Sequence, residues 1–123
     1  MEYQYRFEKL NVYTEARKLV VMVYQLIKSF PREEMFALCD QLRRASVSVP
    51  SNIAEGSGRF SVKEQIHFLE ISYGSLMEVY CQLDVAMDLG YVSEDAIKPI
   101  KSQISTVARL MGGYRKSLGT RQQ

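Results

Sequence analysis

An apolar heptad between residues 61 and 89 constrains the fold of this chain more than any other feature. Its apolar residues are spaced alternately four and three apart, which is the pattern of helices that pack lengthwise in bundles. Ser61 and Glu64 form a capping box before it, and Gly90 follows its end. The pattern predicts a helix over residues 61–89 with this buried stripe: Val62, Ile66, Leu69, Tyr73, Leu76, Tyr80, Leu83 and Met87.

Three other stretches have apolar residues at helical spacing, and the sequence has no alternation typical of a strand. They predict helices over about residues 12–30, 33–57 and 94–118. With 123 residues, of which 46% are hydrophobic, the chain is long enough for one core. Because short loops connect antiparallel neighbours, we predict an all-α fold, an antiparallel up-down-up-down four-helix bundle that forms a single domain over residues 1–123.

Prolines and glycines predict how the helices bend and end. Pro50 lies within the second helix and predicts a kink there rather than a break, because the apolar spacing continues past it. Pro99 is tolerated only near a first turn, so it moves the expected start of the fourth helix toward Lys98. The second helix is expected to end in the left-handed conformation at two glycines, Gly56 and Gly58.

The chain has no sequence feature of a membrane or exported protein. No run reaches the ~18 apolar residues of a membrane span, and the N-terminus lacks the apolar core of a signal peptide. We therefore expect a cytoplasmic protein with no membrane partner. Cys39 and Cys81 match no metal-binding spacing, so both are expected to be reduced packing residues.

The predicted first helix is apolar over more than one face. Its buried stripe is accompanied by further apolar residues at positions 20, 21, 22, 24 and 26. A four-helix monomer would bury only one face of such a helix. Two interpretations follow and both remain open: the helix lies deep in the bundle, or it forms a subunit interface.

A polar line runs beside the apolar stripe of the second predicted helix. Ser48, Asn52, Glu55 and Arg59 recur at helical spacing, and the last two form an i,i+4 pair in the favourable order. One interpretation is structural, with Asn52 and Glu55 holding helix ends or loops through hydrogen bonds. The other is a ligand or RNA contact through Asn52, Glu55 and Arg59.

Small residues on the second and third helices are expected to face one another. If the chain folds back at Arg59, residues at equal distances before and after Arg59 lie opposite one another. Ser46 and Ser48 then face residues 70–74. Small residues opposite small residues let two helices approach closely. This reflection about Arg59 also places Arg43 and Arg44 near Ser75 and Glu78. The two arginines are expected to pair with Glu78.

Basic residues share one side of the predicted fourth helix. No acid follows Asp95, and the bases lie away from the apolar stripe. A row of mobile cations is what contact with backbone phosphates requires, although a solvated face is the alternative. The candidate residues for RNA binding are Lys98, Lys101, Arg109, Arg115, Lys116 and Arg59, with Arg121 as an extension of the row.

The sequence does not indicate catalytic chemistry. His67 is the only histidine, and no cysteine or second histidine accompanies it in a metal-binding or nucleophile–base pattern. The glycines at 56 and 58 lack the preceding strand that a phosphate-binding loop requires. We therefore expect no enzyme activity, no catalytic residue, no metal and no cofactor.

Three segments resemble a known family: RRASVSVPSNIAEGSGR, IHFLEISYGSLMEV and QLDVAMDLGYVS. They are similar to the bacterial four-helix-bundle proteins encoded within intervening sequences of 23S ribosomal RNA genes, also called S23-type proteins. The resemblance extends from about Phe7 to Tyr114. Its motif residues, structural or binding, include Arg43, Arg44, Asn52, Glu55, Gly56 and Glu78.

The resemblance implies an assembly but no catalytic residues. The family is similar in fold to the accessory protein of diversity-generating retroelements, a basic bundle that assists a reverse transcriptase, and both are associated with ring-like homo-pentamers. Two functions are consistent with the residues and the resemblance. One is a non-enzymatic, oligomeric bundle that binds structured RNA electrostatically. The other is a protein–protein adaptor, for example an accessory subunit of a reverse transcriptase.

Overall fold

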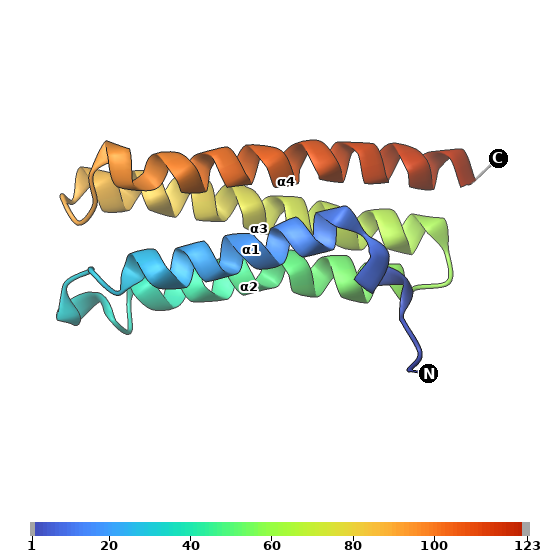
Figure 1. Cartoon of the computed structure of the whole chain (residues 1–123), viewed down its shortest axis with the longest axis horizontal. Coiled ribbons are helices and arrows are strands. Elements are labelled where there is room, and N and C mark those ends of the chain that lie inside the picture. The colour runs from blue at the N-terminus through green and yellow to red at the C-terminus, as the bar shows by residue number, and fades with distance from the viewer. Residues whose placement is uncertain (1, 122–123) are drawn as a thin grey trace.

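Four long helices make up most of the chain. The structure, a computed structural model, describes the backbone of residues 2–121 and the side chains of residues 2–119. The chain direction reverses from each helix to the next, so the all-α bundle is confirmed, without a strand in the described residues (Figure 1). The elements are η1 (Arg6–Lys9), α1 (Asn11–Ile27), η2 (Arg32–Glu34), α2 (Leu38–Ser57), α3 (Val62–Asp88) and α4 (Glu94–Arg121).

Each helix packs against its neighbours around a square. α2 contacts α1 and α3, and α4 contacts α3 and α1, with the α2–α3 interface the most extensive. Side chains from all four helices meet along the axis in one continuous apolar core. Its fully buried larger members are Leu19, Val23, Leu42, Val49, Ile53, Leu76, Val79, Leu83, Ile97, Ile104 and Val107.

Both ends of α3 are fixed by local hydrogen bonds that the sequence predicts. The Ser61 hydroxyl accepts the amide hydrogen of Glu64 at 3.1 Å. At the other end Gly90 has a φ of 78°, the left-handed conformation that glycine adopts without strain. The amides of Gly90 and Tyr91 donate to the carbonyls of Met87 and Ala86 at 2.9 and 3.0 Å, which is a Schellman motif.

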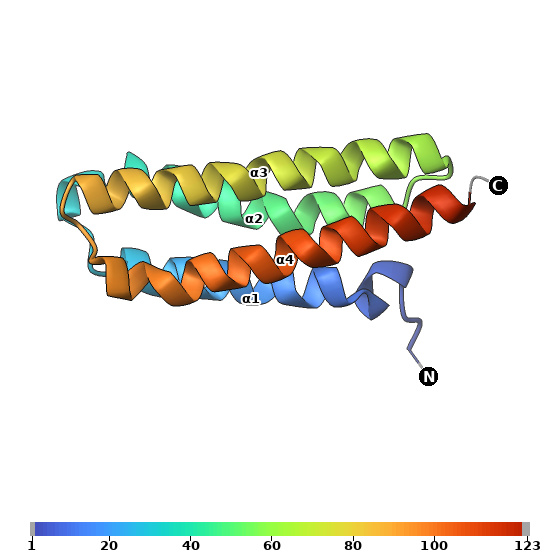
Figure 2. The ribbon, with the colours of Figure 1, turned by 90° about the horizontal axis from the view of Figure 1, so that it is seen from above.

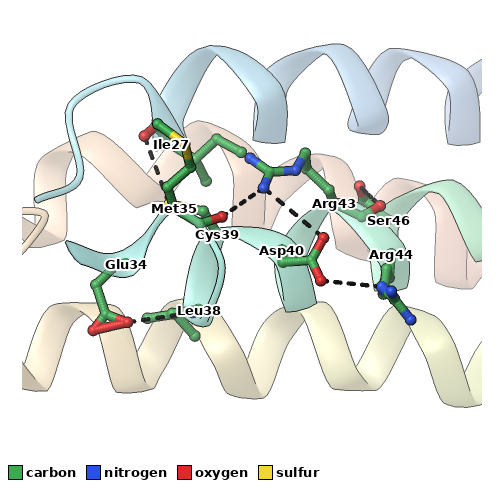
Figure 3. A network of polar contacts seen from close by, with 9 residues as sticks. All are labelled: Ile27, Glu34, Met35, Leu38, Cys39, Asp40, Arg43, Arg44 and Ser46. Atoms are coloured by element: carbon green, nitrogen blue, oxygen red, sulfur yellow. Dashed lines mark hydrogen bonds and ion pairs between the residues drawn. The ribbon is translucent and has the colours of Figure 1, made fainter. Parts of the chain in front are cut away.

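The start of α2 differs from the prediction. The helix begins at Leu38 instead of residue 33, because residues 35–37 are held in a separate turn (Figure 3). The guanidinium of Arg43 donates to the Met35 carbonyl at 2.6 Å, and the Glu34 carboxylate accepts the amide of Leu38 at 3.3 Å. These side chains form hydrogen bonds with a carbonyl and an amide that would bond to other backbone groups if the helix were continuous. α1 likewise ends three residues early, at Ile27.

Two predictions about prolines and glycines are wrong. α4 begins at Glu94, as the predicted range has it, and continues through Pro99, so the expected shift of its start toward Lys98 is wrong. The Ser93 hydroxyl caps the helix by accepting the amide of Ala96 at 3.1 Å. Gly58, at the end of α2, has a φ of −86° and therefore does not use the left-handed conformation. α2 continues without a break through Pro50, as predicted.

The buried stripe of α3 is rotated relative to the predicted one. Leu69, Leu76 and Leu83 are buried as expected, but Tyr73 is 46% exposed and Tyr80 is 38% exposed. A second heptad, which shares the three leucines, faces the core instead, because its small members allow α2 to approach closely. Its remaining members are Gln65, Ser72, Val79 and Ala86.

α1 does not lie deep in the bundle. Val21 and Tyr24 are exposed, so the deep placement is wrong for the single chain, and the subunit-interface interpretation stays a prediction. Both cysteines are free; Cys39 is a buried packing residue as expected, whereas Cys81 is exposed on α3. None of the helices, within the residues described, is long and apolar enough to cross a membrane.

Candidate nucleic-acid interface

The polar line of α2 is mostly used in a hydrogen-bonded seam with α3. The hydroxyls of Ser48 and Ser75 lie 2.8 Å apart across the two helices. The Asn52 amide donates to both the carbonyl and the hydroxyl of Ser48, each at 2.9 Å. The buried Ser72 hydroxyl donates to the carbonyl of Val49 at 2.7 Å. This geometry supports the structural interpretation for Asn52.

The end of α2 is joined to α3 through Arg59. Its guanidinium pairs with Glu55 at 2.8 Å, as predicted, and lies 4.5 Å from the centre of the Phe68 ring. The Arg59 carbonyl accepts a hydrogen bond from the Gln65 amide at 2.7 Å. Gly56 of α2 lies against Phe68 of α3. A β-carbon built on Gly56 would lie only 2.7 Å from the β-carbon of Phe68, so glycine is required for the two helices to approach this closely.

The predicted pairing of Arg43 and Arg44 with Glu78 is wrong. The contacts between Gly56 and Phe68, and between Ser48 and Ser75, lie five to six residues further along α3 than a reflection about Arg59 predicts. This register still brings Glu78 level with the two arginines, so the pairing fails because their side chains bind other groups. The offset arises because the first turn of α3 extends past the end of α2 (Figure 2). The Glu78 carboxylate instead accepts a weak hydrogen bond from Gln82 at 3.4 Å.

The two arginines of α2 share one acid on their own helix. Asp40 lies 3.9 Å from Arg43 and 3.2 Å from Arg44 (Figure 3). Arg43 is partly buried and holds the turn before α2, whereas Arg44 is exposed. An exposed pair of this kind contributes little to stability. Arg44 therefore remains open to a partner, while Arg43 has a structural contact.

Lys101 does not belong to an open cationic strip. Its ammonium pairs with Asp84 of α3 at 2.5 Å and lies 4.4 Å from the centre of the Tyr80 ring. The Lys101 side chain is only 25% exposed. The hydrogen bond to Asp84 raises its pKa above the ordinary value for lysine. This residue therefore connects α3 to α4, which helical spacing within α4 could not indicate.

The other candidates on α4 remain at the surface. Lys98 lies 3.9 Å from Asp95, and Arg115 lies 3.7 Å from Glu70 of α3, in pairs whose members are all more than half exposed. Arg109 and Lys116 are exposed on the same helix. The side chain of Arg121 lies outside the described residues. The revised cationic strip of α4 is thus Lys98, Arg109, Arg115 and Lys116.

The N-terminal segment adds one base, Arg6, close to the C-terminal half of α4, which the sequence did not predict. η1 and the start of α1 lie at the same end of the bundle as the C-terminal half of α4 (Figure 2). Burial raises the pKa of Tyr114, and the charge of nearby Arg6 partly opposes that shift. Arg109 lines a shallow cleft with Leu10 and Asn11. No periodic signal connects η1 to α4, because only the folded bundle places them together.

A groove between α3 and α4 was also missed. It has a volume of about 480 Å³ and an apolar floor, with the Glu70–Arg115 pair among its lining residues. Two glycines inside helices are the sequence signal that could have indicated it, because glycine disfavours a helix interior. The lining residues are Leu69, Glu70, Tyr73, Gly74, Ala108, Met111, Gly112 and Arg115.

The fold and this surface define an all-α four-helix bundle with a closely packed α2–α3 seam and a cationic fourth helix. The chain belongs to the 23S rRNA-intervening sequence protein family, whose family model matches residues 8–113. This confirms the family resemblance seen in the sequence.

One solved structure shows the same fold. It is a protein of unknown function from the S23 ribosomal protein family of Bacteroides thetaiotaomicron, 21% identical to this chain, with a TM-score of 0.78. The alignment covers 85% of this chain and 98% of that one. No curated protein matches the chain. Neither the family description nor that of the solved structure indicates an enzyme.

Proposed function

We propose that the protein is a non-enzymatic RNA-binding protein that contacts the phosphates of structured RNA through the cationic strip of α4. The observation that carries the proposal is the charge of the chain after Asp95, where six bases occur without a single acid. Lys101 is engaged with Asp84, but Lys98, Arg109, Arg115 and Lys116 are exposed. We further propose that the protein binds RNA in the cytoplasm.

Exposed lysine and arginine side chains suit phosphate contacts that do not read base sequence. Each contact releases counterions, so affinity falls as salt concentration rises. Phosphates can replace Asp95 and Glu70 as the partners of Lys98 and Arg115, because exposed ion pairs contribute only about 0–1 kcal/mol to stability. The family name refers to an intervening sequence of 23S rRNA, which makes that RNA the first one to test.

Charge reversal tests the strip directly. We expect the double variant Arg109→Glu with Lys116→Glu to weaken binding to a structured RNA about tenfold or more, and to flatten the dependence of log affinity on log salt. The matched control is Lys28→Glu with Arg32→Glu, two exposed residues outside α4, which changes the net charge equally. Equal losses in both double variants, measured by filter binding, would contradict a role specific to α4.

The proposal includes a homo-oligomer, with a pentamer as the form implied by family resemblance. Exposed Val21 and Tyr24 on α1 support self-association, because isolated subunits gain by covering such residues. Several weak strips on one assembly would bind RNA together through effective concentration. Light scattering at micromolar concentration tests this, and a mass equal to the 14.2 kDa monomer would contradict it.

A protein–protein adaptor is the second candidate function. The observation that favours it is the exposure of Phe36 in the turn before α2 and Phe60 in the α2–α3 loop, at opposite ends of the bundle. Exposed aromatic residues are typical anchors of protein interfaces. Capture from lysate before and after nuclease treatment separates the two functions, since an adaptor keeps its partners and an RNA-binding protein loses them.

A further inference from the structure

The α3–α4 groove is an open recess and not a closely packed helix interface. β-carbons built on Gly74 and Gly112 would meet no atom within 4 Å, apart from the helix itself. Both glycines line the groove, whose volume of about 480 Å³ is in the ~300–1,000 Å³ range of small-molecule sites. These glycines are thus not needed for helix contact, and their effect is to leave space beside Tyr73.

The groove combines an apolar floor, an aromatic side chain and a cation. Leu69, Ala108 and Met111 line it together with Tyr73, which is nearly half exposed. Arg115 lines it at the α4 side and continues into the acid-free part of that helix. An apolar, aromatic surface beside cations matches an unpaired nucleotide, whose base has a flat π face and whose phosphate is an anion.

Glu70 is the one acid in the groove, and it is only loosely held. Its carboxylate lies 3.7 Å from the Arg115 guanidinium, and both side chains are more than half exposed. A pair with this distance and exposure is weak. A phosphate can therefore replace Glu70 as the partner of Arg115 without breaking a buried contact.

We propose that the α3–α4 groove binds an unpaired nucleobase of the RNA, stacked on Tyr73, with its phosphate at Arg115. Paired bases in an A-form helix are inaccessible to such a recess, so only loops, bulges or ends can enter it. The inference rests on the proposed RNA binding and gives it a preference: RNA with unpaired bases binds more tightly than a duplex of equal charge.

The test compares two RNAs of equal length, one a hairpin with an unpaired bulge and the other fully paired. Tyr73→Ala removes the stacking surface, and we expect it to weaken binding of the bulged RNA about fivefold or more with little effect on the paired RNA. Tyr3→Ala is the matched control, because Tyr3 is 78% exposed in the N-terminal segment and does not line the groove. It should retain the preference.

A second variant tests the groove without removing the tyrosine. Gly112→Leu fills the recess, and the space around Gly112 accommodates the added β-carbon. We expect it to abolish the preference for bulged RNA while binding of paired RNA persists. Circular dichroism and urea unfolding establish that each variant is folded before its affinities are compared.

The possible outcomes separate this inference from the RNA-binding proposal. Wild-type protein that binds neither RNA overturns both. Wild-type protein that binds both RNAs equally, or that keeps its preference in Tyr73→Ala and Gly112→Leu, overturns the nucleobase site alone. A change in molar mass in Gly112→Leu, with both affinities reduced alike, assigns the groove to a second copy of the chain and also overturns it.

Discussion

The α2–α3 and α3–α4 interfaces use small residues in opposite ways. Between α2 and α3, Gly56 lies directly against Phe68, and Ser48 and Ser72 bond to the opposite helix. Between α3 and α4, Gly74 and Gly112 face open space. The comparison shows that a glycine inside a helix can either admit a neighbouring helix or leave a recess, and that spacing alone does not distinguish the two.

The interfaces also differ in how polar contacts hold them. The α2–α3 contacts are short hydrogen bonds, of which the one from Ser72 to the Val49 carbonyl is fully buried. The α3–α4 contacts are ion pairs near the surface, from Lys101 to Asp84 and from Arg115 to Glu70. Because exposed ion pairs contribute little, we expect α2–α3 to carry more of the stability and α3–α4 to be free for binding.

The largest expected effect comes from adding one carbon to the close interface. Gly56→Ala would place a β-carbon 2.7 Å from the β-carbon of Phe68, which cannot rotate away. We expect this overpacking to lower the free energy of unfolding by about 1–3 kcal/mol. Urea unfolding followed by circular dichroism measures it.

Gly112→Ala is the matched control for that substitution. Its β-carbon meets no neighbouring atom, so the higher helix propensity of alanine should raise the free energy of unfolding by about 0.5–1 kcal/mol. Effects of the same sign at both glycines would contradict the comparison between the interfaces.

The next effect tests the buried hydrogen bond of the α2–α3 seam. Ser72→Ala removes the donor to the Val49 carbonyl, and we expect a loss of about 1 kcal/mol in the free energy of unfolding. Ser102→Ala, on the exposed side of α4, should change it by no more than about 0.5 kcal/mol. If the two serines proved equivalent in thermal and urea unfolding, the seam would have no special role.

The smallest effect concerns the ion pair across α3 and α4. Lys101→Met should cost at most about 1 kcal/mol, and Lys98→Met should have no measurable effect, because Lys98 is more exposed and further from its acid. Asp84 raises the pKa of Lys101 in the folded protein. The ion pair therefore stabilises the fold fully below the pKa of an unfolded-state lysine, about 10.4, and this stabilisation is lost as the pH rises through the pKa of Lys101 in the folded state. Wild type and Lys101→Met should therefore converge in stability at alkaline pH, and a difference that grows with pH would contradict this assignment.

Local contacts of the candidate sites are predictable from the sequence, whereas contacts between distant segments are not. The Glu55–Arg59 pair and the Ser61 cap are confirmed, because each depends on residues within four positions of one another. The predicted pairing of Arg43 with Glu78 is wrong, because the Arg43 guanidinium instead contacts the Met35 carbonyl, in a turn that helical spacing does not predict. The engagement of Lys101 with Asp84 was missed for the same reason: the spacing within α4 says nothing about its neighbour.

The sequence by itself determined that this chain forms four amphipathic helices, where α3 is capped, and which family it belongs to. Those features depend on apolar spacing, backbone conformations and motif residues that are all local. Only the tertiary structure decided which of the two overlapping heptads of α3 is buried. Tyr73 and Tyr80 have more apolar surface than Ser72 and Ala86, yet the small residues face the core. The physical reason is that the rotation of a helix about its axis depends on packing summed over all its neighbours, and close approach to α2 outweighs burial of two tyrosines.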